Sequence, residues 1–197
     1  MMNNSTSKTA DLPIISFICS TDFENWLELN HNNSNGIWLQ FYKKNSGTTS
    51  INYKEALDVA LCYGWIDGQL KKMDENSYLQ RFTHRRPKSL WSIRNIENVD
   101  RLVEIGRMKP TGLKEAEAAK ADGRWDRAYE TAGRMILPDD FMQELSTNTK
   151  AQTFFDSLNR TNKYTIYWRL QTAKNTEIRV KRMKAILDML EKGQKFH

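Results

Sequence analysis

Apolar and polar side chains follow two different periods along this chain of 197 residues. In the first half, apolar residues recur at every second position in short runs, as in strands that bury one face. Runs with helical spacing lie between them, and the second of these closes at Gly64. The pattern predicts strands over 36–43, 65–70 and 78–84 and helices over 21–30 and 52–63.

The run from 36 to 43 shows the alternation most clearly. It places Ile37, Leu39 and Phe41 on one face of a strand, and the other face receives Trp38, Gln40 and Tyr42. The order helix, strand, helix and strand pair is typical of a small α+β lobe with a mostly antiparallel sheet.

After Pro87 the spacing becomes helical throughout. Predicted helices begin at Ser92, Thr111, Pro138, Ala151, Tyr164 and Thr176. We therefore predict an α+β fold with the sheet and its helices in 12–91 and an all-helical lobe in 92–197, the two forming one compact unit. Residues 1–11 are polar and predict a flexible tail.

Three helix starts carry capping signals. Thr21 is followed by Glu24 and Asn52 by Glu55, the spacing at which a polar side chain and an acid three residues later cap a helix reciprocally. Thr176 is expected to cap the last helix.

Composition excludes several classes of protein. Hydrophobic residues make up 39% of the chain, which excludes a wholly disordered protein. The apolar run 12–19 lacks the basic start and cleavage site of a signal peptide, and nowhere do ~18 apolar residues follow one another, so we expect a cytoplasmic protein without membrane insertion. Cys19 and Cys62 lie far apart and are interpreted as reduced thiols, with Cys62 packed in the core.

The net charge of +6 is concentrated in two segments. Residues 81–96 carry +5 and residues 160–184 carry +7, so the rest of the chain carries −6. The second segment alternates with apolar positions as a solvated helix face does. The first segment follows a predicted strand, where Arg85, Arg86 and Lys88 could hold a phosphate or carboxylate.

Motifs of known chemistry are missing from the sequence. The three histidines are scattered, and we find no zinc-protease, nucleophile-elbow, phosphate-loop or dinucleotide fingerprint. We accordingly predict no catalytic residue, no metal site and no cofactor, and we favour a binding protein over an enzyme.

The segment Gly64–Gly68 is the densest candidate motif. Trp65 and Asp67 could place an aromatic wall and an acid at one cleft. The alternative is structural: Trp65 packs in the core, Gly68 admits a close backbone, and Asp67 forms an ion pair with Arg81.

Tryptophan stands beside arginine at further positions. Trp91 precedes Arg94 by nearly one helical turn, and Arg124 adjoins Trp125 in an irregular segment. Such pairs can hold aromatic or anionic ligands, or they can lie in a seam between helices with the arginine reaching out to water.

Together these segments resemble the YdeI/OmpD-associated family of bacteriocin-protection proteins. The resemblance begins after about residue 20 and is carried in order by Tyr53–Gly68, Gln80–Ser92, Gly106–Gly112, Ala121–Tyr129, Phe154–Phe155 and Tyr167–Arg182. It departs at Thr176 and Ile178, where such proteins often have Pro and Thr around Glu177. The resemblance implies a role in resistance to bacteriocins or cationic antimicrobial peptides and carries over no catalytic residue.

Three hypotheses follow. In the first, a stress-protection protein binds an anionic small molecule or protein partner through residues at the rim of one face: Trp65, Asp67, Arg81, Arg85, Arg86, Lys88, Trp91, Arg124 and Trp125. In the second, the basic segment 81–96 binds nucleic acid. In the third, the protein is an enzyme that uses Asp67 as a general base.

Overall fold

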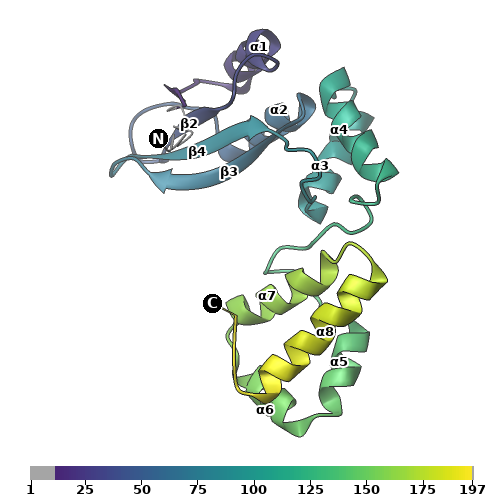
Figure 1. Cartoon of the computed structure of the whole chain (residues 1–197). Coiled ribbons are helices and arrows are strands. Elements are labelled where there is room, and N and C mark those ends of the chain that lie inside the picture. The colour runs from purple at the N-terminus through teal and green to yellow at the C-terminus, as the bar shows by residue number, and fades with distance from the viewer. Residues whose placement is uncertain (1–11, 197) are drawn as a thin grey trace, which may run out of the picture. The chain divides into compact units, whose positions relative to one another are not determined.

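The computed structural model describes residues 12–196, and the predicted tail over 1–11 lies outside the described residues. Its contacts divide the chain into two compact units (Figure 1). The first comprises the chain up to Pro87 together with Val99–Glu117, and the second comprises Lys88–Asn98 and the chain from Ala118 onward. The boundary falls inside two helices, α3 (Ile93–Glu104) and α4 (Pro110–Ala121). Each unit is described by itself.

A four-stranded sheet forms the centre of the first unit. Its strands are β1 (Ile14–Ile15), β2 (Ile37–Tyr42), β3 (Trp65–Lys72) and β4 (Ser77–His84), in the order β1-β2-β4-β3. All neighbours are antiparallel except β1, which runs parallel to β2. The predicted α+β fold with a mostly antiparallel sheet is confirmed. Sequence analysis missed β1 because two residues are too few to display an alternation.

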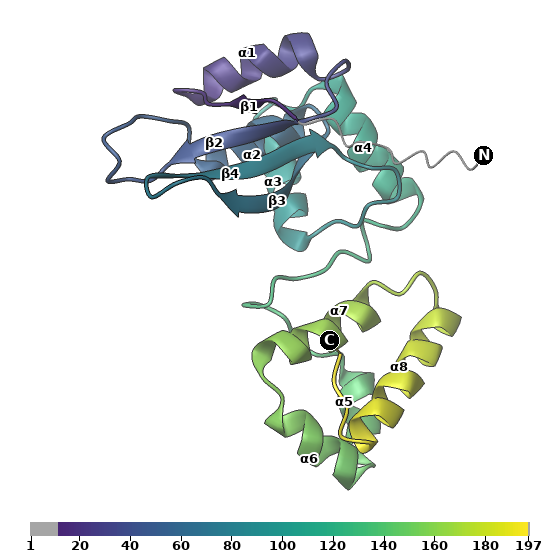
Figure 2. The same cartoon turned by 60° about the vertical axis from the view of Figure 1, so that its left-hand side comes forward.

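Helices α1 (Ser20–Asn30) and α2 (Tyr53–Cys62) cover one face of this sheet. Phe23 of α1 meets Phe82 with ring centroids 5.9 Å apart, and Tyr53 of α2 meets Phe41 at 6.5 Å. Ile37, Leu39 and Phe41 share this face, as the alternation predicted, and all three are buried. Figure 2 shows the strands with α2 behind them, so the face that carries Trp38 is the open one.

The ends of α2 form as the sequence indicated. The Asn52 side chain accepts from the Glu55 backbone at 3.0 Å, and the Glu55 carboxylate accepts from the Asn52 backbone at 3.2 Å. Gly64 follows with φ +75°, a conformation that ends helices and favours glycine. The predicted cap at Thr21 is wrong: α1 begins at Ser20, so Thr21 already lies within the first turn.

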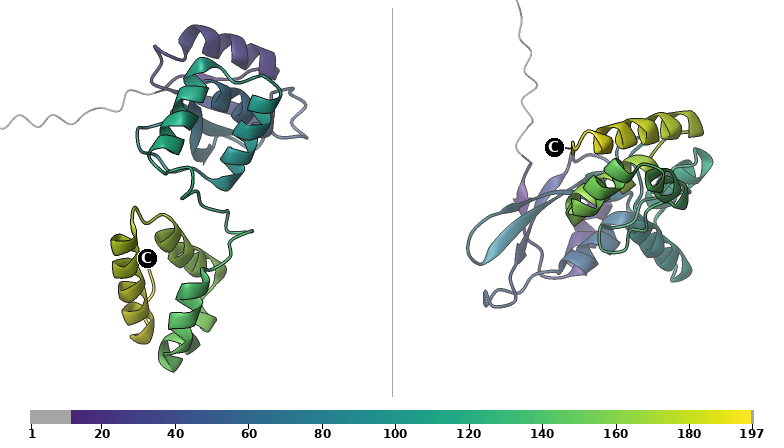
Figure 3. Two further views of the ribbon diagram at one scale, coloured as in Figure 1. Left: turned by 90° about the vertical axis from the view of Figure 1, so that its right-hand side faces the viewer. Right: turned by 90° about the horizontal axis from the view of Figure 1, so that it is seen from below.

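The second unit packs four helices around an apolar core (green to yellow in Figure 3). They are α5 (Asp139–Ser146), α6 (Thr149–Ser157), α7 (Arg160–Gln171) and α8 (Thr176–Glu191). Three of them start at asparagine caps, namely Asn148, Asn159 and Asn175. Two helices consequently begin earlier than predicted, and the cap of α8 is Asn175 instead of Thr176. The core residues include Phe141, Leu145, Phe155, Ile166, Leu170, Ile186 and Leu190.

No helix within residues 12–196 combines the length and the apolar character that crossing a bilayer requires.

Candidate functional site

Trp65, predicted as the wall of a ligand site, lies in the core of the first unit. Its side chain is fully buried, and its indole N–H donates to the His31 carbonyl at 3.2 Å. Its ring lies edge-on to Trp26, with centroids 5.8 Å apart, and 5.0 Å from the ring of His84. The ring is therefore part of the packing between α1 and the sheet and presents no open surface.

Asp67 and Arg81 lie on opposite faces of the sheet. Asp67 is paired with Phe82, whose ring faces the helices, and accepts a hydrogen bond from the Tyr53 hydroxyl of α2 at 2.9 Å. Arg81 is one residue removed from Phe82 and is paired with Trp38 on the open face. Because side chains alternate between faces along a strand, the ion pair considered between Asp67 and Arg81 does not form.

The two arginines after β4 differ in exposure. The side chain of Arg85 is buried, with 5% of the residue accessible, and its backbone N–H donates to Gly64 at 3.0 Å. The side chain of Arg86 is exposed. Of the two, Arg86 is therefore the one that a ligand in solution would meet first.

Lys88, Trp91, Arg124 and Trp125 belong to the second unit. The rings of Trp91 and Trp125 lie 5.0 Å apart, and Tyr129 donates from its backbone to the Trp91 carbonyl at 3.1 Å. The structure thus brings together two segments that the sequence singled out separately. Lys88 is exposed and has φ +65°, the left-handed conformation that only glycine adopts readily.

Arg124 links the segment that contains Trp91 with the segment that contains Trp125 by hydrogen bonds of its buried side chain. It is 6% exposed, and its Nε donates to both carboxylate oxygens of Asp122 at 2.8 Å. Its Nη1 donates to the Ser89 carbonyl at 3.1 Å. Because this guanidinium is bound to a carboxylate and a carbonyl, it stabilises the fold. Trp125 is half-buried, and the ammonium of Lys120 lies 4.8 Å from its ring centroid.

Sequence analysis missed a cluster on the open face of the sheet, which consists of Trp38, Lys71 and Arg81. The Lys71 ammonium lies 4.1 Å from the centroid of the Trp38 ring, and Arg81 is the direct cross-strand partner of Trp38. A cation on an exposed aromatic ring contributes about 0.5–1 kcal/mol, so Lys71 is held only weakly. We call these three residues the Trp38 cluster.

Among residues 12–196, the strand positions around the Trp38 cluster carry no acid. The strand register assigns the following side chains to the open face: Ile14, Trp38, Gln40, Tyr42, Ile66, Lys71, Ser77, Leu79, Arg81 and Thr83. Gln40 donates to the Ser77 hydroxyl at 3.0 Å, which fixes the polar neighbour of Trp38 along β2. Two cations and two exposed or half-buried aromatic rings without a carboxylate make a surface that attracts anions.

Arg81 itself is left without an anionic partner. Its Nε is buried and has no hydrogen-bond partner among residues 12–196, and it takes part in none of the ion pairs that these residues form. A polar group removed from water without a partner costs free energy. The sequence did carry one signal for this site: a tryptophan on the polar face of an otherwise regular amphipathic strand.

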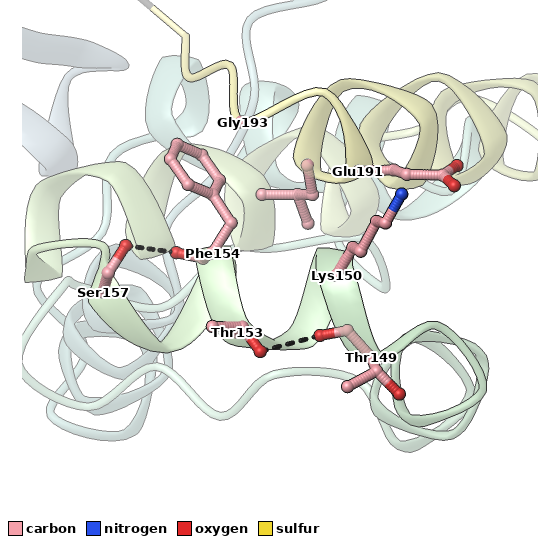
Figure 4. Close-up of a pocket in the computed structure, with 8 residues that line it drawn as sticks. Thr149, Lys150, Thr153, Phe154, Ser157, Glu191 and Gly193 are labelled. Atoms are coloured by element: carbon pink, nitrogen blue, oxygen red, sulfur yellow. Dashed lines mark hydrogen bonds between the residues drawn. The ribbon is translucent and has the colours of Figure 1, made fainter.

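Two shallow grooves lie in the second unit. One of about 470 Å³ runs between α6 and the end of α8, with the Phe154 ring along it and Lys150 and Glu191 at one end (Figure 4). The hydroxyls of Thr153 and Ser157 donate to carbonyls of their own helix at 2.8 and 2.6 Å. The other, of about 450 Å³, lies between α5 and α8. Neither brings together a nucleophile and a base.

A third hollow, of about 410 Å³, lies at the end of β2 in the first unit. Lys43, Lys44 and the hydroxyl residues Thr48, Thr49 and Ser50 line it. The ammonium of Lys43 donates to the Glu75 carbonyl at 2.9 Å. Phe41, Tyr53 and Tyr78 also line it, so it lies toward the helix-covered side of the sheet.

Groups suited to metal or nucleophilic chemistry are scattered. Within residues 12–196, no three side chains of His, Cys, Asp or Glu gather closely enough to hold a metal ion. Burial raises the pKa of the Cys62 thiol to about 11, which keeps it protonated at neutral pH and unreactive.

Two family models match the chain. Residues 15–115 match the model described as "Domain of unknown function (DUF8412)". Residues 134–193 match "Bacteriocin-protection, YdeI or OmpD-Associated", and this match confirms the resemblance over this segment. The motifs earlier in the chain were expected to belong to the same family, and they lie mainly in the range of the other model. The second match associates the chain with a bacteriocin-protection-related role. No curated protein and no solved structure matches the chain.

Proposed function

The chain belongs to the DUF8412 family through residues 15–115, and from that premise we propose that this domain binds an anionic ligand on the open face of its sheet. The ligand would meet the Trp38 cluster, with Lys71 and Arg81 holding the negative group and Trp38 supplying the flat wall. In a chain whose residues 134–193 match a bacteriocin-protection family, this binding would serve a protective role.

The observation that carries the proposal is the unpartnered guanidinium of Arg81. It is the direct neighbour of Trp38, and among residues 12–196 no strand position on the open face carries a carboxylate. A guanidinium accepts phosphate or carboxylate in a forked geometry, and its hydrogen bonds to an anion are stronger than those to neutral groups. Compared with the sequence-based hypothesis, Trp38 takes the place of the buried Trp65 and Trp91, and Arg81 is retained.

The proposal is tested with inorganic tripolyphosphate as the probe, by titration calorimetry on the full chain at low salt. Lys71 and Lys72 offer a matched pair, because they are adjacent on β3 and point to opposite faces, Lys72 being paired with Glu75. We expect Lys71→Gln and Arg81→Gln each to raise the Kd by about tenfold, the loss of one charge-assisted hydrogen bond. Lys72→Gln should change the Kd by less than about twofold.

Equal losses in Lys71→Gln and Lys72→Gln would show that the probe senses only overall charge, and the proposal would then fail. The protective role is tested separately by expressing the chain in a bacteriocin-sensitive bacterium. Survival that falls in Lys71→Gln and Arg81→Gln, and stays unchanged in Lys72→Gln, connects binding with protection.

A further inference from the structure

We propose that the ligand of the Trp38 cluster is a single-stranded nucleic acid, with a base stacked on Trp38 and phosphates paired with Lys71 and Arg81. This inference rests on the proposed anion-binding function and names the class of anion. It differs from the sequence-based nucleic-acid hypothesis in its location: the ligand lies on the open face of the sheet, where Arg81 is shared with the segment 81–96 and the basic residues from Arg85 onward take no part.

The first argument is the combination of an aromatic ring with two cations, one from each of the next two strands of the sheet, β4 and β3. Lys71 lies over the ring of Trp38 and Arg81 beside it, on paired strands of one flat surface. Unstacked bases bind to aromatic side chains on exposed sheets, and phosphates bind to nearby lysine and arginine. A small inorganic anion would make no use of the Trp38 ring.

The second argument concerns what covers the ring. An ammonium on an exposed aromatic face is held more weakly than a stacked base. A base can therefore displace the Lys71 ammonium from Trp38, and the released ammonium lies within reach of the adjoining phosphate. The exposed position of Lys71 on β3 leaves its side chain free to make this movement.

The third argument is the length of the surface. Tyr42 lies on the same face as Trp38 four residues further along β2, a separation of about 13 Å in a strand. The aromatic surface along β2 is thus longer than one nucleotide needs. The turn between β3 and β4 carries the acids Asp74 and Glu75, of which Glu75 is paired with Lys72.

Duplex DNA fits this surface less well. Bases within a duplex are stacked on one another and offer no free face to Trp38, and reading a groove calls for a protruding helix or ribbon. The open face is the side of the sheet that lies away from α2 in Figure 2. Trp38 is half-buried on this face. The expected preference is therefore for single strands.

The test measures fluorescence anisotropy of a labelled oligothymidylate of about twelve nucleotides with the full chain. Three competitors are compared: an abasic strand of equal charge, a duplex of equal length, and tripolyphosphate. We expect the oligothymidylate to bind about tenfold more tightly than the abasic strand. Log K should fall with log salt, and Lys71→Gln should reduce that slope by about 0.7, the value for one phosphate contact on a single strand.

Variants of tryptophan separate stacking from charge. Trp38→Leu should weaken oligothymidylate binding about tenfold and leave the abasic strand within twofold, whereas Trp38→Phe, which keeps a ring, should retain most of the difference. Trp168→Leu is the control, because Trp168 is 38% exposed on α7 of the other unit. The comparison of oligothymidylate with abasic strand on the unaltered protein stands even if Trp38→Leu fails to fold.

The outcomes separate the two proposals. Equal binding of the oligothymidylate and the abasic strand, or tighter binding of the duplex, overturns the single-strand inference. If tripolyphosphate still binds in that case and depends on Lys71, the anion-binding function stands by itself. If neither probe binds, both proposals fail.

Discussion

Asp67 of β3 and Arg81 of β4 lie on adjacent strands and face opposite sides of the sheet. The register pairs Asp67 with Phe82 on the helix-covered face, while Arg81 is paired with Trp38 on the open face. The carboxylate is accordingly occupied by the Tyr53 hydroxyl at 2.9 Å, and the guanidinium is left for a ligand. Two residues that sequence reasoning placed at one rim thus have separate roles.

Because Asp67 and Arg81 are separated in this way, the effects of substituting them on the free energy of unfolding should be additive. Asp67→Ala removes the acceptor of the Tyr53 hydroxyl and should lower the free energy of unfolding by about 1 kcal/mol. Arg81→Gln should have a small effect on stability and a large one on anion binding. Because the two side chains share no partner, the double variant should equal the sum of the single variants within about 0.5 kcal/mol.

Urea denaturation of the four proteins in the cycle measures this directly. A coupling free energy above about 1 kcal/mol would mean that Asp67 and Arg81 interact across the strands after all, and the assignment of opposite faces would have to be abandoned.

The same pair shows how far the sequence could predict the site. Alternation in β2 predicted which side chains share a face, and it placed Trp38 and Phe41 correctly on opposite faces. The relative register of β3 and β4 was not predicted, because the pairing shifts between Asp67 and Leu70, and Gly68 in this interval signals an irregularity without fixing the residues that pair on either side of it. A shift of one position in the pairing of β3 with β4 would move the Asp67 side chain from the helix-covered face, where it accepts from Tyr53, to the open face, which carries Arg81.

Tryptophans illustrate a second limit. The sequence alone does not tell which tryptophan is accessible to a ligand, Trp65 near an acid or Trp38 in a regular strand. Packing distinguishes them, because Trp65 is buried against Trp26 and Trp38 lies on the open face. The reciprocal pair of cap and acid was predicted correctly at Asn52 and wrongly at Thr21. Helices that begin at a single asparagine cap were predicted to start too late, as at Asn148 and Asn159.

Gly112 permits a close approach of α4 to the end of α2. A Cβ at this position would come within 2.6 Å of the Leu61 carbonyl oxygen and closer still to that of Cys62. Backbone atoms cannot yield as a flexible side chain can, so α4 would have to move. Gly112→Ala should therefore lower the free energy of unfolding by about 3 kcal/mol, at the upper end for overpacked sites.

Gly133→Ala is the control for this substitution, since its Cβ would meet nothing closer than 3.9 Å. Thermal unfolding compares the two variants. If Gly112→Ala melts within 2 °C of the unaltered protein, the contact between α4 and α2 is looser than described.

The two cysteines should differ in reactivity. Cys19 is exposed, whereas Cys62 is buried and its pKa is raised to about 11 by burial, which disfavours the thiolate. At pH 8 a thiol reagent such as dithionitrobenzoate should modify one equivalent rapidly in the folded protein and the second only upon unfolding. Cys19→Ser should abolish the rapid phase. Rapid modification of two equivalents would place Cys62 at the surface.

Asp140 at the start of α5 should make the stability of the second unit depend on acidity. Hydrogen bonds from the Arg179 guanidinium, one of them 2.8 Å long, hold the pKa of Asp140 below its ordinary value of 3.8. A carboxyl whose pKa is lower in the folded than in the unfolded state stabilises the fold above its unfolded pKa. That contribution is lost as the pH falls through the folded pKa, since the unfolded chain then binds more protons.

Lowering the pH from about 5 to about 3 should thus reduce the free energy of unfolding less in Asp140→Asn than in the unaltered protein, because the variant has no such carboxyl to protonate. Asp139→Asn removes the same charge from the same turn of α5 and leaves the contact with Arg179 intact. Urea titrations at the two pH values measure the difference. An acid sensitivity that Asp139→Asn relieves as fully as Asp140→Asn would assign the effect to the net charge of the helix start, and the link between α5 and α8 would carry no pH dependence of its own.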